Sequence, residues 1–252
     1  MRYFLSLSLL IVFTTLIILP VYGEPSSYDV AIASYINTSW GYGAKENYYN
    51  LTIVQAINDN WNNYELPISP ILIKATIAVE SSFRPDAVSN SGYAGLMQIG
   101  KREAQEQGLS LSPTDERLIP EKNLAAAIKI LKIKHNVILH PLELYHNKPW
   151  ALRVNNFYLN YGYPTIYQQW ILTLAAYNGG GATVLRAMNY CILGGKDPRV
   201  WTNLVLPDKP GSSPLYKAIL DIYGGSYATS KYYQMAEYPI KILDLANSAS
   251  SY

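Results

Sequence analysis

The segment from Glu80 to Ile99 contains the residue types best suited to chemistry in this chain of 252 residues. Glu80 follows the apolar run 71–79, so a buried helix there would carry its carboxyl group into a place of low dielectric. Burial raises the pKa of a carboxyl group, and a glutamic acid that keeps its proton near neutral pH can act as a general acid. An isolated glutamate more often caps or salt-bridges a helix end, so both interpretations stay open until the neighbouring residues are considered.

The elements that must position Glu80 are predicted to be a helix and a tight turn. Ser69 and Pro70 form a helix start, with Ser69 as the N-cap and Pro70 at the first helical position. The helix is expected to run to about residue 82 and must stop before Pro85. Gly92 and Gly95 bracket a tight turn or hairpin, where a missing side chain lets backbone and ligand approach closely.

The remainder of the chain is predicted to be mainly α-helical, without repeats or sustained strand alternation. Apolar spacing and helix-start or helix-stop residues predict further helices over 51–62, 101–107, 121–134, 167–178, 215–223 and 238–247. The glycine run 179–181 is a strong helix terminator. Residues 136–166 show no clear periodicity, and residues 190–230, rich in Gly, Pro and Ser, are expected to be loops apart from the short helix over 215–223.

Composition narrows the function classes. Apolar residues make up 49% and charged residues 15% of the chain, which favours a sizeable core and argues against global disorder. The formal net charge of +2, with no basic run, argues against nucleic acid as a partner. The 23 tyrosines pair a flat apolar face with a hydroxyl group, which suits sugar rings, although most of them must serve the core or the surface.

The N-terminus is predicted to be an export signal. Arg2 supplies a positive start, residues 4–19 form an apolar stretch, and residues 21–23 offer small residues for cleavage. The alternative is an uncleaved membrane anchor, because residues 4–22 are long enough to span a bilayer of roughly 30 Å. Both interpretations place the protein outside the cytoplasm, in the periplasm, in the cell wall or secreted.

The predicted domain organisation is a signal segment over 1–23, an N-terminal extension over 24–65 and one helical domain over 66–250. Cys191 is the only cysteine and cannot form an internal disulfide, so cysteine usage neither supports nor opposes export.

Three separated segments together resemble the catalytic domain of lytic transglycosylases of the soluble-lytic type, which share the goose-lysozyme-like fold. The matching positions are Glu80-Ser81, Phe83, Pro85, Ala87, Ser89, Gly92 and Gly95 to Ile99 in the first segment, Pro120 with Asn123-Leu124 in the second, and Leu174 to Asn178 followed by glycines in the third. A weaker fourth match covers Tyr238 to Ile242. The resemblance extends over about residues 66–245 and implies a lysozyme-like helical domain, with a small hairpin or loop region lining a groove.

The resemblance assigns the catalytic acid to Glu80. In this family one glutamate protonates the glycosidic oxygen between N-acetylmuramic acid and N-acetylglucosamine, and as a carboxylate it then takes the proton of the sugar's own 6-hydroxyl group. That hydroxyl closes on the anomeric carbon and gives a 1,6-anhydro product, so one carboxyl group replaces the flanking pair of ordinary glycosidases. Asp86, the nearest other acid, is expected to be exposed and structural.

The resemblance also implies a set of substrate-binding residues, and these are Ser81, Ser89, Met97, Gln98, Tyr177, Asn178 and Tyr238. Met97 is flexible and apolar, which fits the wall of a groove against a sugar face, although an isolated Met more often lies in a core. Gln98 offers a donor and an acceptor to hydroxyl or acetamido groups. Tyr177 is expected to form a wall, Asn178 to hydrogen-bond sugar and Tyr238 to orient Glu80.

Other chemistries have weaker support. His135, His140 and His146 are the only histidines, and they lack the Cys or paired-carboxylate neighbours of a zinc site, so neither a metal nor a cofactor is expected. No nucleophile triad has a recognisable signature. The alternatives left open are a hydrolysing muramidase on the same fold and a non-catalytic wall-binding or scaffold protein. The expected partner is the peptidoglycan glycan strand, with cell-envelope machinery as a further candidate.

Overall fold

The computed structural model describes residues 26–61 and 66–249, and these residues form a mainly α-helical protein, as predicted. In chain order the helices are α1 (Ser27–Tyr35), α2 (Asn50–Asn60), α3 (Pro70–Ser81), α4 (Lys101–Glu106), α5 (Pro120–Leu139), α6 (Pro141–Tyr145), α7 (Pro149–Tyr161), α8 (Ile166–Gly179), α9 (Gly181–Leu193), α10 (Trp201–Val205), α11 (Pro214–Tyr223) and α12 (Gly225–Ser248), with 3-10 turns η1 (Gly43–Lys45), η2 (Glu116–Leu118) and η3 (Pro210–Ser212). Extended pairing within these ranges is limited to two isolated bridges, Val88 with Ala94 and Ala94 with Ile99.

The extension before α3 packs onto the helical domain. α2 contacts both α3 and α5, and its apolar residues, such as Ile53, belong to the same buried cluster as the rest of the core. The buried ammonium group of Lys74 on α3 donates hydrogen bonds to the Ile36 carbonyl oxygen at 2.7 Å and to the Asn47 side chain. A buried charge satisfied in this way fastens the loop between α1 and α2 to the helix that carries Glu80.

The predicted export signal over 1–23 lies outside the described residues. Among the residues that are described, no helix is long and apolar enough to cross a membrane.

The predicted helix that carries Glu80 is confirmed as α3, with Pro70 in its first turn. Ser69 is its N-cap residue, but the Ser69 side chain makes no capping hydrogen bond. α3 packs against α2, near the start of the chain, and against α12, near its end, so the helix with Glu80 contacts elements from both ends of the chain. α5 packs against α8.

Two segments contain more helix than was predicted, although the predicted short helix over 215–223 is confirmed as α11. Residues 136–166 hold the end of α5 together with α6 and α7, and residues 190–230 hold the end of α9 with α10, α11 and the start of α12. In α7 the buried residues Ala151, Val154 and Tyr158 recur at helical spacing, but the exposed Leu152 and the half-buried Phe157 between them hide the pattern. The glycine run ends α8 as predicted, yet α9 begins at once, at Gly181.

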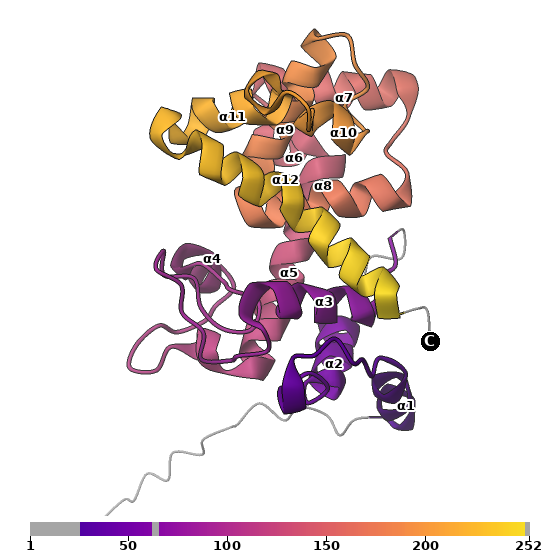
Figure 1. Cartoon of the computed structure of the whole chain (residues 1–252), viewed down its shortest axis with the longest axis vertical. Helices are drawn as coiled ribbons and strands as arrows, with labels where there is room; N and C mark the ends of the chain where they lie inside the picture. Colours follow the sequence, from indigo (N-terminus) through magenta and orange to yellow (C-terminus); the bar gives the residue numbers. More distant parts are fainter. Residues whose placement is uncertain (1–25, 62–65, 250–252) are drawn as a thin grey trace, which may run out of the picture.

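The last helix is much longer than predicted. α12 begins at Gly225, well before residue 238, and it continues through Pro239. Figure 1 shows it as the long yellow helix that crosses the molecule from α11 to α3, and it packs against α11, α8 and α3. Its buried residues Ala228, Tyr232 and Met235 continue the helical spacing toward Tyr238. This packing offsets the hydrogen bond that a proline inside a helix removes.

Candidate active site

Glu80 lies in the last turn of α3 and accepts a hydrogen bond from the hydroxyl group of Tyr238 on α12, at 2.5 Å. The predicted contact between these two residues is therefore present. Burial raises the pKa of Glu80 from 4.5 to about 7, while the Tyr238 hydrogen bond and the positive charge of Lys231 act in the opposite direction. Near neutral pH the carboxyl group populates both its protonated and its ionised form, as a group that first donates and then accepts a proton requires.

A loop of residues 83–100 packs beside the end of α3 and is held by one buried amide. Asn123, in the first turns of α5, accepts a hydrogen bond from the Met97 backbone N–H at 2.9 Å. Its Nδ2 donates to the carbonyl oxygens of Ala94 at 3.2 Å and of Arg117 at 2.8 Å. Both donors and the acceptor of this fully buried side chain are used, which fixes the path of the loop.

Gln98 sits at a strained point of this loop. Its φ is +47°, a value that non-glycine residues adopt rarely, and Ser82 and Phe83 after α3 also have positive φ. The Gln98 Nε2 donates to the carbonyl oxygens of Ala87 at 3.1 Å and Gly95 at 2.8 Å. These bonds hold the side chain in place, and such strain is typical of functional sites.

The end of α8 supplies a second wall. The Tyr177 hydroxyl group donates to the Met97 carbonyl oxygen at 2.9 Å, which joins α8 to the loop. Burial raises the pKa of this phenol well above its ordinary value, so it stays neutral. The next residue, Asn178, accepts hydrogen bonds from Lys231 of α12 through its backbone and side-chain oxygens, at 3.0 and 3.2 Å.

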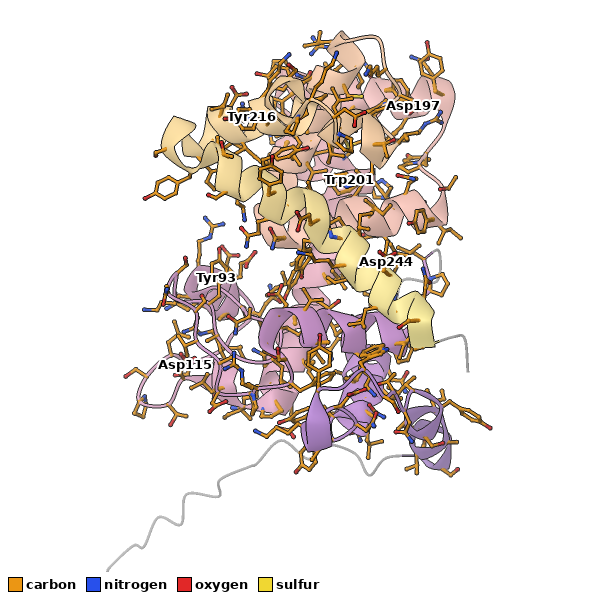
Figure 2. All side chains as sticks on the ribbon, in the orientation of Figure 1. Tyr93, Asp115, Asp197, Trp201, Tyr216 and Asp244 are labelled. Carbon is orange, nitrogen blue, oxygen red and sulfur yellow. The ribbon has the colours of Figure 1, made fainter. Side chains whose placement is uncertain are left out.

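A cavity of about 1100 Å³ lies between the loop, the end of α8 and the first turns of α12. Five of the predicted site residues line it, namely Glu80, Ser89, Gln98, Tyr177 and Asn178. Tyr93 lines it as well, and in Figure 2 this residue projects from the edge of the loop that faces the start of α12. A second cavity of about 210 Å³ has Tyr238 in its wall and shares Glu80, Asn178 and Gln234 with the first, so the two cavities adjoin at these residues.

Two predicted binding residues do not line either cavity. The Met97 side chain is fully buried in the core, because the hydrogen bonds of its backbone to Asn123 and Tyr177 turn it inward. The Ser81 side chain is also buried, and its hydroxyl group donates to the Ile77 carbonyl oxygen at 3.2 Å. The prediction that these side chains bind substrate is not supported. The Met97 backbone joins the loop to Asn123 and Tyr177, and Ser81 belongs to the buried face of α3.

Several cavity residues were not predicted. Lys231 and Gln234 of α12 and Tyr223 of α11 line the larger cavity. Tyr223 lies at the end of the predicted helix over 215–223, and Lys231 and Gln234 lie before the predicted start of the last helix. The spacing of buried residues along 228–239 could have revealed this helix, but no sequence feature marks Lys231 itself.

The structure gives no support for a metal centre in the part of the chain that it describes, where no three His, Cys, Asp or Glu side chains cluster suitably. His135 contacts the rings of Trp61 and Trp170 in the interior, and His140 contacts the ring of Tyr163.

In the variant Tyr238→Phe, the pH dependence of kcat is expected to move to higher pH. The Tyr238 hydrogen bond lowers the pKa of Glu80, so its loss is expected to raise that pKa from about 7 and to keep the acid protonated to higher pH. At pH 6, kcat is expected to fall about tenfold, because a hydrogen bond to a charged group contributes on the order of 1.5–3 kcal/mol. The measurement is kcat, between pH 5 and 9, for the glycan-cleaving activity that the family resemblance implies. An unchanged alkaline limb would show that this hydrogen bond does not tune the acid.

Comparison with known proteins places this arrangement in a family. The Transglycosylase SLT domain matches residues 57–191, which is more than half of the chain. An endo-type membrane-bound lytic murein transglycosylase A of Cronobacter sakazakii is 35% identical over 94 residues, covering 35% of this chain and 46% of the relative. A membrane-bound lytic murein transglycosylase C of Salmonella typhimurium is 32% identical over 124 residues, covering 47% of this chain and 29% of the relative.

The chain spans less than half the length of these curated relatives. The family match nevertheless begins in α2, contains α3 with Glu80, the loop of residues 83–100, α5 and all of α8, and ends in α9. These are the elements that form most of the cavity around the carboxyl group, and the chain therefore belongs to the transglycosylase SLT domain family.

Proposed function

We propose that this protein is an exported peptidoglycan lytic transglycosylase. It cleaves the β-1,4 bond between N-acetylmuramic acid and N-acetylglucosamine and leaves 1,6-anhydromuramoyl ends. Membership of the SLT family supports the reaction class, and the curated relatives are named lytic murein transglycosylases. The observation that carries the proposal is a single carboxyl group, that of Glu80, at the junction of the two cavities, with its pKa raised to about 7.

The other carboxylates near the site are already engaged or lie elsewhere. Glu103 lines the larger cavity, but its carboxylate forms an ion pair with Lys134 at 2.6 Å. Asp86 is exposed, as predicted, and is not in the wall of either cavity. A hydrolysing glycosidase ordinarily places a second carboxylate across the scissile bond. The arrangement here favours a mechanism in which one group performs both proton transfers.

The reaction proceeds in two proton transfers at Glu80. The protonated carboxyl group donates its proton to the glycosidic oxygen, the bond to the anomeric carbon breaks, and N-acetylglucosamine leaves with a free 4-hydroxyl group. The resulting carboxylate then accepts the proton of the muramic 6-hydroxyl group while its oxygen bonds to the anomeric carbon. The acid is regenerated and no water is consumed. Tyr238 holds the carboxyl group through the 2.5 Å hydrogen bond.

The remaining residues bind the strand. Asn178 offers its amide N–H groups to hydroxyl and acetamido oxygens, and Gln98, whose two N–H donors are used within the loop, offers its Oε1 as an acceptor to sugar hydroxyl or N–H groups. Ser89 offers a hydroxyl group, and Tyr177 closes one wall. The protein acts outside the cytoplasm, where its substrate lies, and the segment 1–23 either directs export or stays as an anchor. The relatives are named as membrane-bound enzymes, which supports an envelope location.

The test is mass spectrometry of the fragments that the protein releases from purified cell walls. Anhydro ends, one water lighter than reducing ends, are the expected result. Reducing ends would replace the proposal by a hydrolysing muramidase, and protein that binds walls without releasing fragments would indicate a scaffold.

A further inference from the structure

Lys231 and Lys101 line the larger cavity without a carboxylate partner among the ion pairs of the described residues, and Lys231 is the one whose ammonium group is hydrogen-bonded to a predicted binding residue, Asn178. Lys231 is half-buried in the second turn of α12. Its ammonium group donates to the Asn178 carbonyl oxygen at 3.0 Å, to Asn178 Oδ1 at 3.2 Å and to Gln234 Oε1 at 3.1 Å. An ammonium group has three N–H donors, so all of them are used.

The bond to Asn178 determines which way the amide of that residue faces. A lysine ammonium can only donate, so the oxygen of the amide must point to Lys231 and the Nδ2 group must point away from it. Asn178 lines both cavities, and its two N–H donors are therefore held ready for acceptor oxygens of a bound strand. The carbonyl oxygen of Asn178 also belongs to the last turn of α8, where a positive charge is favourable.

The close approach of α8 and α12 depends on Gly179. A Cβ atom at this position would overlap the side chain of Met235 on α12. The absence of a side chain thus brings the end of α8 against α12 and allows Lys231 to reach across to Asn178.

The charge of Lys231 also acts on Glu80. Its positive charge lowers the pKa of the carboxyl group, and the charge of Glu80 raises the pKa of Lys231 against the effect of burial. The other titratable groups that interact with Glu80 are Tyr93, Tyr177 and Tyr238, whose pKa values are all raised, so they stay neutral. Among the remaining cavity residues, Lys134 is paired with Glu103, Arg102 with Glu106 and Lys241 with Glu237, while Lys101 has no carboxylate partner among the ion pairs of the described residues.

We infer that Lys231 is a positioning residue, which aims the Asn178 amide at the sugar and keeps a positive charge beside Glu80 while that group is a carboxylate. This inference rests on the proposed function, because the sugar and the carboxylate step belong to that reaction. Lys231 itself need not touch the substrate, since its three donors are occupied within the protein.

The test compares Lys231→Met, which removes the charge with little change of shape, with Lys231→Arg, which keeps it. Lys217→Met on the exposed side of α11 is the matched control. In Lys231→Met, kcat/KM is expected to fall on the order of 10- to 100-fold, the range associated with lost positioning. The double variant with Asn178→Ala is expected to have the same KM as Asn178→Ala alone, because Lys231 acts on binding through Asn178.

A second readout needs no turnover. The Glu80 carboxyl carbon, assigned by comparison with Glu80→Gln, is followed by 13C NMR during a pH titration. Its midpoint is expected to move to higher pH in Lys231→Met and to stay near the wild-type value in Lys231→Arg and Lys217→Met. A midpoint that does not move, or fully additive changes in KM, would overturn the role of Lys231 while the wild-type protein remains active. Wild-type protein that releases no fragments from cell walls would instead overturn the proposed function.

Discussion

The variant Glu80→Gln is expected to cleave cell walls about 10²–10⁴-fold more slowly than the wild type, which is the usual contribution of a positioned general acid. The amide keeps the shape of the side chain but has no acidic proton for the glycosidic oxygen and no carboxylate for the 6-hydroxyl group. The measurement is the rate of fragment release from purified walls. Asp86→Asn is the matched control, because Asp86 lies six positions further along the chain, is exposed and is outside both cavities.

Thermal unfolding separates lost chemistry from lost folding in this variant. The pKa of Glu80 is raised by folding from 4.5 to about 7, so the folded state binds this proton more tightly than the unfolded state. The contribution of Glu80 to the free energy of unfolding therefore falls as the pH rises from about 5 through 7. Relative to wild type, Glu80→Gln is expected to gain stability between pH 5 and pH 8. An active Glu80→Gln protein would contradict the assignment of the acid, and a variant with no unfolding transition would point to a structural role.

The variant Gly95→Ala is expected to lower the free energy of unfolding by about 4 kcal/mol, through backbone strain and overpacking together. Gly95 has a φ of +82°, and a Cβ atom there would overlap the Arg117 carbonyl oxygen and the Asn123 side-chain amide. Neither neighbour can move easily, since Asn123 is fully buried with all its hydrogen-bonding groups used. Because Gly95 also accepts a hydrogen bond from Gln98, activity is expected to fall with stability.

Gly108→Ala provides the control for this effect. Gly108 has nearly the same φ, +81°, but a Cβ atom there would have no neighbour within 4 Å. The strain of the backbone alone is expected to lower the free energy of unfolding by about 1 kcal/mol. Urea unfolding of the two variants measures the difference. Equal losses would show that the overlap with Arg117 and Asn123 is relieved by movement of the loop.

The sequence was most informative where a local rule specified the structure. Pro70 begins α3, and the helix ends after Glu80, as the position of Pro85 requires. The apolar run before Glu80 predicted the burial that raises the pKa of its carboxyl group. The glycine run ends α8 directly after Asn178, which brings the predicted Tyr177 and Asn178 to the cavity.

The long last helix shows where local rules fail. Pro239 and the glycines near residue 225 favour a last helix that begins later than α12 does, because proline and glycine disfavour a helix interior. Packing of α12 across α11, α8 and α3 offsets these local preferences. Lys231 reaches the cavity only through that packing.

The sequence by itself determined the helical class, the identity of the candidate acid and five of the residues that line its larger cavity, since periodicity, caps and terminators act over a few neighbouring positions. Only the tertiary structure decided which side chains face the cavity. Met97 and Gln98 are adjacent in sequence, yet one is in the core and the other lines the cavity. The Met97 backbone is held because its N–H donates to Asn123 and its carbonyl oxygen accepts from Tyr177. Such contacts join residues far apart in the chain, and no local pattern encodes them.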